Sequence, residues 1–310
     1  MTDHYFENDF VKLHYYRFGN GDQHMLCFHG FGMHGRQFIS LEKELGAKYT
    51  FWGFDLFFHK ETKLKDESLP TVKAGLDKKQ LIDLVTAFCD ERGIDRFSVI
   101  GYSMGSHFAT TVVEGLPERI DEFIVAAPSS IEPGALIRFF GANKLGNKML
   151  EKLMLSEKAL LGMIKLCRNL RFIDDAGRDI LLKEIGTPEL RFALYASFTY
   201  LRLLETDEQR FLDLVERYNI RTIFIFGKRD KMYLPKIGDA FFKKLARAEV
   251  VILDAVRVLG VEVIHRGIIG QHVVDAGHGA ARAAGGGQLV AVGRAEGFAE
   301  IAALEMATQA

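Results

Sequence analysis

The chain has 310 residues and a formal net charge of −1, a length that suits one large α/β domain or a domain carrying a sizeable insert. Apolar residues make up 48% and charged residues 26%, a balance that argues against global disorder. Since there is no basic excess, nucleic acid is not expected as a partner.

Three cysteines, Cys27, Cys89 and Cys167, are too few and too irregularly spaced for a disulfide framework or a zinc site. The first ten residues, MTDHYFENDF, lack the basic stretch and apolar run of a signal peptide. No segment is long and apolar enough to span a bilayer. We therefore expect a cytoplasmic protein without a membrane span.

Short apolar runs and helical periodicities alternate through the first 130 residues. This alternation predicts an α/β fold with a doubly wound, mostly parallel sheet covered by helices on both faces. The expected strands are Val11–Phe18, His24–Phe28, Tyr49–Phe54, Arg96–Ile100 and Phe123–Ala127, and the expected helices are Gln37–Leu45, Leu76–Arg92 and Ser106–Glu114.

Residues 131–218 carry only helical patterns, such as Lys148–Cys167 and Arg210–Tyr218. Strands resume at Arg221–Phe226 and Glu249–Leu253. We therefore assign residues 1–130 and 219–254 to the core and residues 131–218 to an inserted helical cap. The insert is interpreted as a lid over a site, and a separate helical domain is the alternative.

Residues 255–310 differ from the rest of the chain. They are rich in Ala, Gly and Val, and they contain no Lys, Asn, Pro, Ser, Cys, Tyr or Trp. This break defines an atypical Ala/Gly-rich C-terminal segment, which is either a linker and tail, a fusion or a frame-shifted terminus.

The motif Gly101-Tyr102-Ser103-Met104-Gly105 lies between an expected strand and an expected helix. A serine on such a tight corner is exposed and oriented for nucleophilic attack, and close packing of strand and helix requires small residues at Gly101 and Gly105. Ser103 is therefore the candidate nucleophile. An ordinary glycine-flanked loop is the alternative.

His29-Gly30-Phe31-Gly32 follows another expected strand. In this position the backbone N–H of Phe31 can pair with that of Met104 to stabilise an oxyanion. His29 and Gly30 support that turn. Alone, the segment would be read as a glycine-rich turn.

Phe226-Gly227-Lys228-Arg229-Asp230 ends a strand after the insert. A carboxylate there can orient an imidazole, so Asp230 is the candidate acid, with Asp254 as the weaker rival. A solvated aspartate in a turn is the alternative.

These three segments, HGFG, GYSMG and GKRD, resemble those of the α/β-hydrolase family over about residues 10–254. The resemblance implies the fold, a serine–histidine–acid triad in the chain order nucleophile, acid, base, and a helical cap. It does not imply a substrate.

The sequence departs from that family at the base. No histidine follows the expected last core strand directly, and the next ones are His265, His272 and His278. His278, after an apolar run that ends in Gly277, matches the family pattern and is the candidate base, with His265 as the alternative.

We therefore expect a serine hydrolase that cleaves a carboxylic ester or related acyl bond, with a hydrophobic small-molecule substrate and neither metal nor cofactor. Thioesterase, C–C hydrolase and acyltransferase chemistry are alternatives on the same fold. A chain whose base does not reach Ser103 would instead be an impaired or non-catalytic binding protein. The sequence leaves the oligomeric state open.

Overall fold

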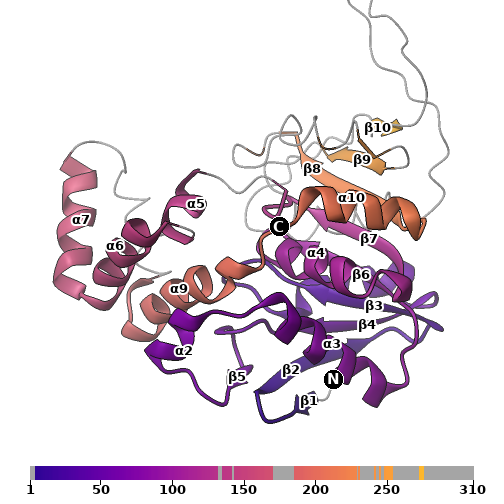
Figure 1. The fold of residues 1–310 in the computed structure, drawn as a ribbon, viewed down its shortest axis with the longest axis horizontal. Helices are drawn as coiled ribbons and strands as arrows, with labels where there is room; N and C mark the ends of the chain where they lie inside the picture. The colour runs from indigo at the N-terminus through magenta and orange to yellow at the C-terminus, as the bar shows by residue number, and fades with distance from the viewer. Residues whose placement is uncertain are drawn as a thin grey trace, which may run out of the picture.

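The computed structural model describes residues 4–131, 135–141, 143–169, 185–228 and 248–253, together with residues 230, 241, 244, 245 and the backbone of 272–275. Within these residues the chain forms one sheet of ten strands (Figure 1). The strands are β1 (His4–Glu7), β2 (Val11–Phe18), β3 (Gln23–Phe28), β4 (Tyr49–Phe54), β5 (Lys63–Leu64), β6 (Phe97–Tyr102), β7 (Ile120–Ala126), β8 (Arg221–Gly227), β9 (Ala248–Leu253) and β10 (His272–Asp275).

The strand order is β1-β2-β4-β3-β6-β7-β8-β9-β10, and β5 pairs with β2. The strands from β4 to β9 run parallel, whereas β1, β2, β5 and β10 join by antiparallel pairing. This order confirms the predicted doubly wound, mostly parallel sheet. The chain leaves β3 toward β4 and returns on its other side as β6, so the loops after β3 and β6 diverge at a topological switch point.

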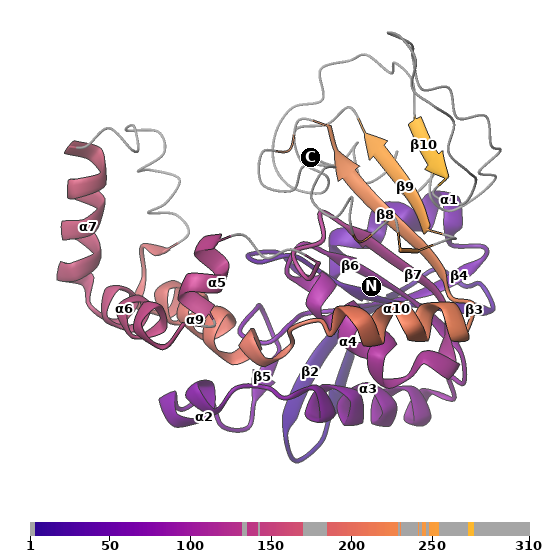
Figure 2. The same ribbon diagram turned by 45° about the horizontal axis from the view of Figure 1, so that its top comes forward.

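Helices cover both faces of the sheet, and each face has its own apolar core. Figure 2 shows α3, α4 and α10 side by side on one face and α1 on the other. Along β6 the side chains alternate between these cores, with Val99 in one and Ile100 in the other. The helices of these layers are α1 (Glu42–Leu45), α3 (Lys78–Arg92), α4 (Gly105–Gly115) and α10 (Glu208–Arg217), with 3-10 turns at Gly35–Leu41 and Pro117–Arg119.

Helix α3 begins and ends on local sequence signals. The Asp77 side chain accepts a hydrogen bond from the Gln80 N–H, and the Gln80 side chain caps the Asp77 N–H in return. Gly93 ends the helix in the left-handed conformation, which glycine adopts without steric cost. The sequence placed the start two residues early, because Leu76 fits the apolar pattern.

A second group of helices, the helical insert, lies between β7 and β8 and gathers at one end of the molecule, away from the sheet (Figure 1). It contains α5 (Ala135–Gly141), α6 (Lys144–Leu155), α7 (Glu157–Asn169) and α9 (Pro188–Tyr200). Its apolar cluster includes Leu150, Leu160 and Tyr195, together with Val72 of α2 (Leu69–Ala74).

Two details of the insert differ from the sequence expectation. The single helix expected over Lys148–Cys167 is broken at Ser156, whose backbone is extended and whose side chain accepts from the Ala159 N–H at 3.4 Å. Serine favours such a capping position over a helix interior. Helix α10 falls in the range expected for the cap but packs against α4 of the core. Its Phe211 also contacts Phe123 of β7 in the sheet.

Strand β10 extends the sheet beyond the last core strand that the sequence predicted. It pairs antiparallel with β9, with Val273 opposite Val251. The other parts of the C-terminal segment, including His265 and His278, lie outside the described residues. In the described part of the chain, none of the helices has the length and apolar character needed to cross a membrane.

Candidate active site

Ser103 occupies the corner between β6 and α4. Its φ is +47°, in the left-handed region that side chains rarely adopt. Such a conformation costs on the order of 1–3 kcal/mol and persists only where the surroundings fix it. The corner therefore has the strained geometry that presents a side chain above the edge of a sheet, as the sequence predicted.

Four hydrogen bonds fix the Ser103 backbone. Its N–H donates to the Ala126 carbonyl oxygen at 2.9 Å. Its carbonyl oxygen accepts from the Ser106 N–H at 2.9 Å, from the Ser106 hydroxyl at 2.6 Å and from the Ser129 hydroxyl at 2.8 Å. The Ser106 hydroxyl also accepts from the Ser130 N–H at 3.0 Å. The sequence analysis did not identify Ser106 or Ser129 as supports of the corner. For Ser129 the available signal was the pair Ser129-Ser130, which closely follows the expected strand Phe123–Ala127.

The glycines on either side of the corner have no room for a side chain. A Cβ at Gly101 would lie 2.7 Å from the Gly105 carbonyl oxygen, and a Cβ at Gly105 would lie 1.9 Å from the Phe28 carbonyl oxygen. Both obstacles are backbone atoms, which cannot move aside cheaply. Strand β6, helix α4 and the end of β3 are therefore in direct backbone contact, which gives the reason for the Gly101 and Gly105 pattern.

The segment His29–Gly32 leaves β3 beside the corner. Phe28 is paired with Gly101 in the parallel register, and a Cβ at Gly30 would lie 2.7 Å from the Tyr102 ring. Among the described residues, neither the Phe31 N–H nor the Met104 N–H has a backbone or side-chain acceptor. Two uncommitted amides on adjacent loops are what an oxyanion site requires.

Two buried histidines hold this loop against the loop that follows β4. The His29 Nε2 accepts from the Leu56 N–H at 2.9 Å, and the His59 Nε2 accepts from the Gly32 N–H at 3.0 Å. Because these nitrogens accept, the Nδ1 atoms carry the protons and donate to the carbonyl oxygens of Gly30 and Phe57. Burial lowers the pKa of both imidazoles, which favours the neutral form that this arrangement needs.

Asp55, directly after β4, is a further buried support that the sequence did not assign. One carboxylate oxygen lies 2.7 Å from the His14 Nδ1, and the other accepts from the Gly35 N–H at 2.8 Å. Both side chains are almost fully buried. Asp55 therefore connects β2, through His14, to Gly35 at the end of the loop that follows β3. In the sequence, its position directly after the apolar run of β4 could have indicated this role.

Asp230 lies beyond the end of β8, two strands from β6 in the sheet order. It is 4% exposed, and its N–H donates to the Gly227 carbonyl oxygen at 3.1 Å. The carboxyl ends of β3, β6 and β8 meet at one edge of the parallel sheet, so Asp230 shares that edge with Ser103. The candidate base His278 and the alternatives His265 and Asp254 fall outside the described residues.

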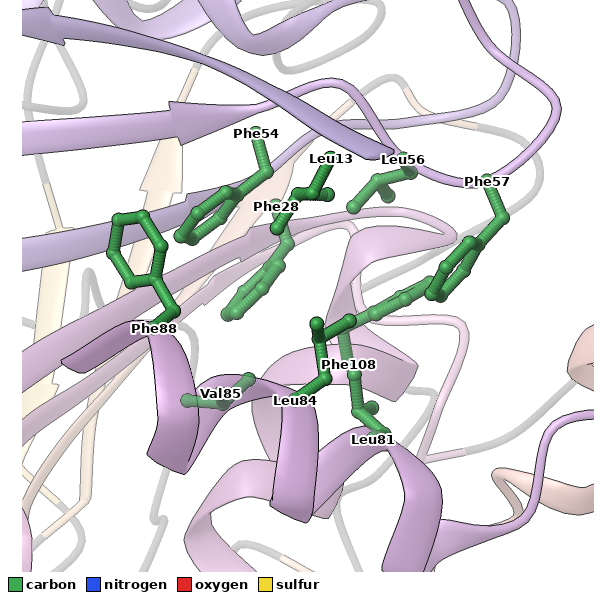
Figure 3. Close-up of a pocket in the computed structure, with 10 residues that line it drawn as sticks. All are labelled: Leu13, Phe28, Phe54, Leu56, Phe57, Leu81, Leu84, Val85, Phe88 and Phe108. Atoms are coloured by element: carbon green, nitrogen blue, oxygen red, sulfur yellow. The ribbon is translucent and has the colours of Figure 1, made fainter. Parts of the chain in front are cut away.

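A small apolar cavity of about 20 Å³ lies under these loops, between the sheet and helices α3 and α4 (Figure 3). Substrate pockets have volumes of roughly 300–1,000 Å³, so this one is packing space and not a substrate site. The residues around it are Leu13, Phe28, Phe54, Leu56, Phe57, Leu81, Leu84, Val85, Phe88 and Phe108. The described residues also contain no cluster of three or more His, Cys, Asp or Glu side chains suited to a metal ion.

Comparisons with known proteins give the same fold. The model of a family described as alpha/beta hydrolase fold matches residues 23–149. A hydrolase from Pseudomonas aeruginosa superposes with a TM-score of 0.57 at 16% identity, covering 82% of this chain and 91% of its own. A membrane phospholipase A, described as a bacterial virulence factor, has a TM-score of 0.55 at 17% identity, covering 81% and 78%.

One curated relative is the dihydrolipoyllysine-residue acetyltransferase component of the acetoin cleaving system of Cupriavidus necator. It is 30% identical over 120 residues, which are 39% of this chain and 30% of the relative. The chain thus spans less than a third of that relative's length. Sheet order, strained corner and family match agree on the α/β-hydrolase fold, and the family model covers residues 23–149 of this chain.

Proposed function

We propose that the chain is a serine hydrolase that cleaves a carboxylic ester or related acyl bond through an acyl-enzyme at Ser103. The observation that carries the proposal is the left-handed backbone of Ser103, held by four hydrogen bonds at the switch point of the sheet. A conformation this costly is maintained where the side chain has a task. The uncommitted N–H groups of Phe31 and Met104 support the same assignment.

In the proposed reaction the Ser103 Oγ attacks the carbonyl carbon of the ester while its proton passes to the His278 imidazole. Asp230 orients that imidazole and stabilises its charged form. The Phe31 and Met104 N–H groups stabilise the oxyanion until the C–O bond breaks and the alcohol leaves with the proton. Water then attacks the acyl-enzyme by the same steps and releases the acid.

The substrate we propose is a small molecule with a hydrophobic acyl or alcohol portion. The helical insert is rich in apolar side chains, and we propose that residues 131–218 include a cap that admits such a molecule. The similarity in fold to a phospholipase is compatible with an ester substrate. Since one fold supports many acyl reactions, the bond type must come from assays with ester, thioester and C–C substrates and an alcohol acceptor.

The decisive test is covalent labelling by a fluorophosphonate probe, which reacts only with an activated serine. We expect the wild-type chain to be labelled and Ser103→Ala to be unlabelled. The control is Ser68→Ala, which changes an exposed serine distant in sequence from Ser103 and should be labelled as the wild type is. Hydrolysis of a short p-nitrophenyl ester should follow the same pattern. An unlabelled wild-type chain would favour a non-catalytic binding protein on this fold.

The base is tested separately. His278→Ala is expected to lower ester turnover by about 10³-fold or more, in line with the loss of a triad member. His265→Ala and His272→Ala serve as matched controls, and both should retain activity. Loss in His265→Ala with full activity in His278→Ala would transfer the role of base to His265.

A further inference from the structure

The outer face of α6 combines exposed apolar and basic side chains. Burial alternates along this helix with helical period, so that Gly146, Leu150 and Met154 face the insert core. The opposite side is here called the basic-apolar face. It consists of Lys144, Leu145, Lys148, Met149, Lys152 and Leu155, which are all exposed.

Exposure of apolar side chains is concentrated in this part of the molecule. Among the described residues, seven of the ten exposed large apolar side chains belong to the helical insert. Leu145 is 66% exposed, Met149 46% and Leu155 47%. Because these three side chains share one side of α6 with exposed lysines, they form a group of the kind that is typical of interaction sites.

Helices α6 and α7 carry more basic than acidic side chains. Residues 144–169 contain six Lys or Arg and two Glu, although the whole chain has a net charge of −1. Both glutamates are committed elsewhere, since Glu151 lies 2.8 Å from Lys73 and Glu157 lies 4.0 Å from Arg191. In the described part of the chain no carboxylate is within ion-pair distance of the three lysines of the basic-apolar face.

Helix α7 continues the pattern at the far end of the insert (Figure 1). Lys158, Leu161, Lys165 and Leu166 are exposed on its outer side. The two helices lie on the side of the insert that is away from the sheet in both views of the fold (Figure 2).

We propose that the basic-apolar face of α6 docks onto the surface of an anionic phospholipid bilayer. Apolar side chains enter the headgroup boundary, while lysines extend their ammonium groups to the lipid phosphates and carboxylates. A protein partner is disfavoured by the composition, because lysine is depleted in protein interfaces relative to the rest of the surface. Docking would place the molecule on the membrane surface without crossing it.

The test is sedimentation of the full chain with vesicles. We expect the wild-type chain to sediment with vesicles of phosphatidylcholine and phosphatidylserine, and to remain in the supernatant with phosphatidylcholine alone. Raising NaCl from about 0.1 M to about 0.5 M should release it, because surface charge is screened. The inference is independent of the proposed chemistry, so Ser103→Ala should bind as the wild type does.

Two sets of variants locate the surface. Lys144→Gln/Lys148→Gln/Lys152→Gln is expected to weaken vesicle partition by roughly 100-fold, since each basic group near an anionic surface contributes about a factor of five. The control Lys43→Gln/Lys63→Gln/Lys79→Gln makes the same change in net charge at exposed lysines of the core and should change partition by less than about twofold.

The apolar set is Leu145→Gln/Met149→Gln/Leu155→Gln, which should likewise weaken sedimentation, with Leu203→Gln/Tyr218→Gln as the control at exposed positions outside helices α5, α6, α7 and α9. Circular dichroism and thermal unfolding confirm that each variant is folded. Absence of wild-type sedimentation with phosphatidylserine vesicles overturns the proposal. Equal losses in the α6 and core variants, or a concentration-dependent dimer that only the α6 variants dissociate, overturn it as well.

Discussion

The Nδ1 atom of His107 lies 3.2 Å from the carbonyl oxygen of Leu204. This contact joins the third residue of α4, four positions after Ser103, to the segment where the chain returns from the helical insert to the core. A carbonyl oxygen only accepts, so the imidazole donates from Nδ1. Burial lowers the pKa of His107 to about 4, against the opposing effect of this hydrogen bond.

The lowered pKa predicts a loss of stability in mild acid. In the unfolded chain the imidazole has a pKa of about 6.5, so between pH 6.5 and 4 the unfolded state binds more protons than the folded state. The contribution of neutral His107 to the free energy of unfolding is fully present above about pH 6.5. It decreases as pH falls toward 4, by roughly 1.4 kcal/mol per pH unit for one such group.

His107→Gln keeps a side-chain donor toward Leu204 and removes the titration. Urea unfolding at intervals from pH 8 to pH 4.5 should therefore give a shallower loss of stability than in the wild type. His29 and His59 also have lowered pKa values and leave a residual slope in the same direction. An unchanged slope in the variant would assign the acid sensitivity to other groups.

The backbone contacts at Gly105 predict a large cost for a single methyl group. In Gly105→Ala the added Cβ meets the Phe28 carbonyl oxygen at 1.9 Å, so β3 and α4 must separate, at a cost of about 3 kcal/mol or more. Gly162→Ala in α7 is the matched control, because nothing lies within 4 Å of its Cβ. That change should stabilise the chain by up to about 1 kcal/mol. Urea unfolding measures both, and equal effects would contradict the packing described at the corner.

Ser106→Ala tests what holds the strained corner. The buried hydroxyl donates to the Ser103 carbonyl oxygen and accepts from the Ser130 N–H, so its loss leaves a buried N–H unsatisfied. We expect a loss of about 1–3 kcal/mol in stability and slower labelling of Ser103 by a fluorophosphonate. Ser129→Ala removes one donor to the same oxygen and should cost only about 1 kcal/mol. If both variants label at the wild-type rate, these side chains do not position Ser103.

His59 is predicted to act on the proposed oxyanion site through the loop and not through the substrate. His59→Phe fills the space but leaves the Gly32 N–H without its acceptor, so the Phe31 amide loses its fixed direction. We expect kcat for an ester to fall by about 10-fold with little change in KM, since a transition-state interaction is weakened. His59→Gln restores an acceptor and should recover part of kcat. A change confined to KM would contradict a positioning role.

The sequence predicted the parallel core well because each of its strands is buried on both faces and therefore appears as an uninterrupted apolar run, as in β4 and β6. Edge strands carry no such signal, and β1 and the two-residue β5 were missed. Within the site, Ser103, Gly101 and Gly105 follow from local geometry. The supports from His14, His59 and Ser129 depend on contacts between residues far apart in the chain, such as His14 with Asp55, which no local pattern encodes.

The hydrogen bonds that fix Ser103 have a consequence for how such a chain diversifies. All four partners come from residues 103–129, within a single strand–helix–strand unit, and the helical insert begins only after them. Under the proposed function, replacement, lengthening or reshaping of the insert would therefore change which molecules reach Ser103 and leave the backbone of Ser103 in place. Substitutions that change substrate access and substitutions that change the position of Ser103 would therefore fall in separate segments of the sequence.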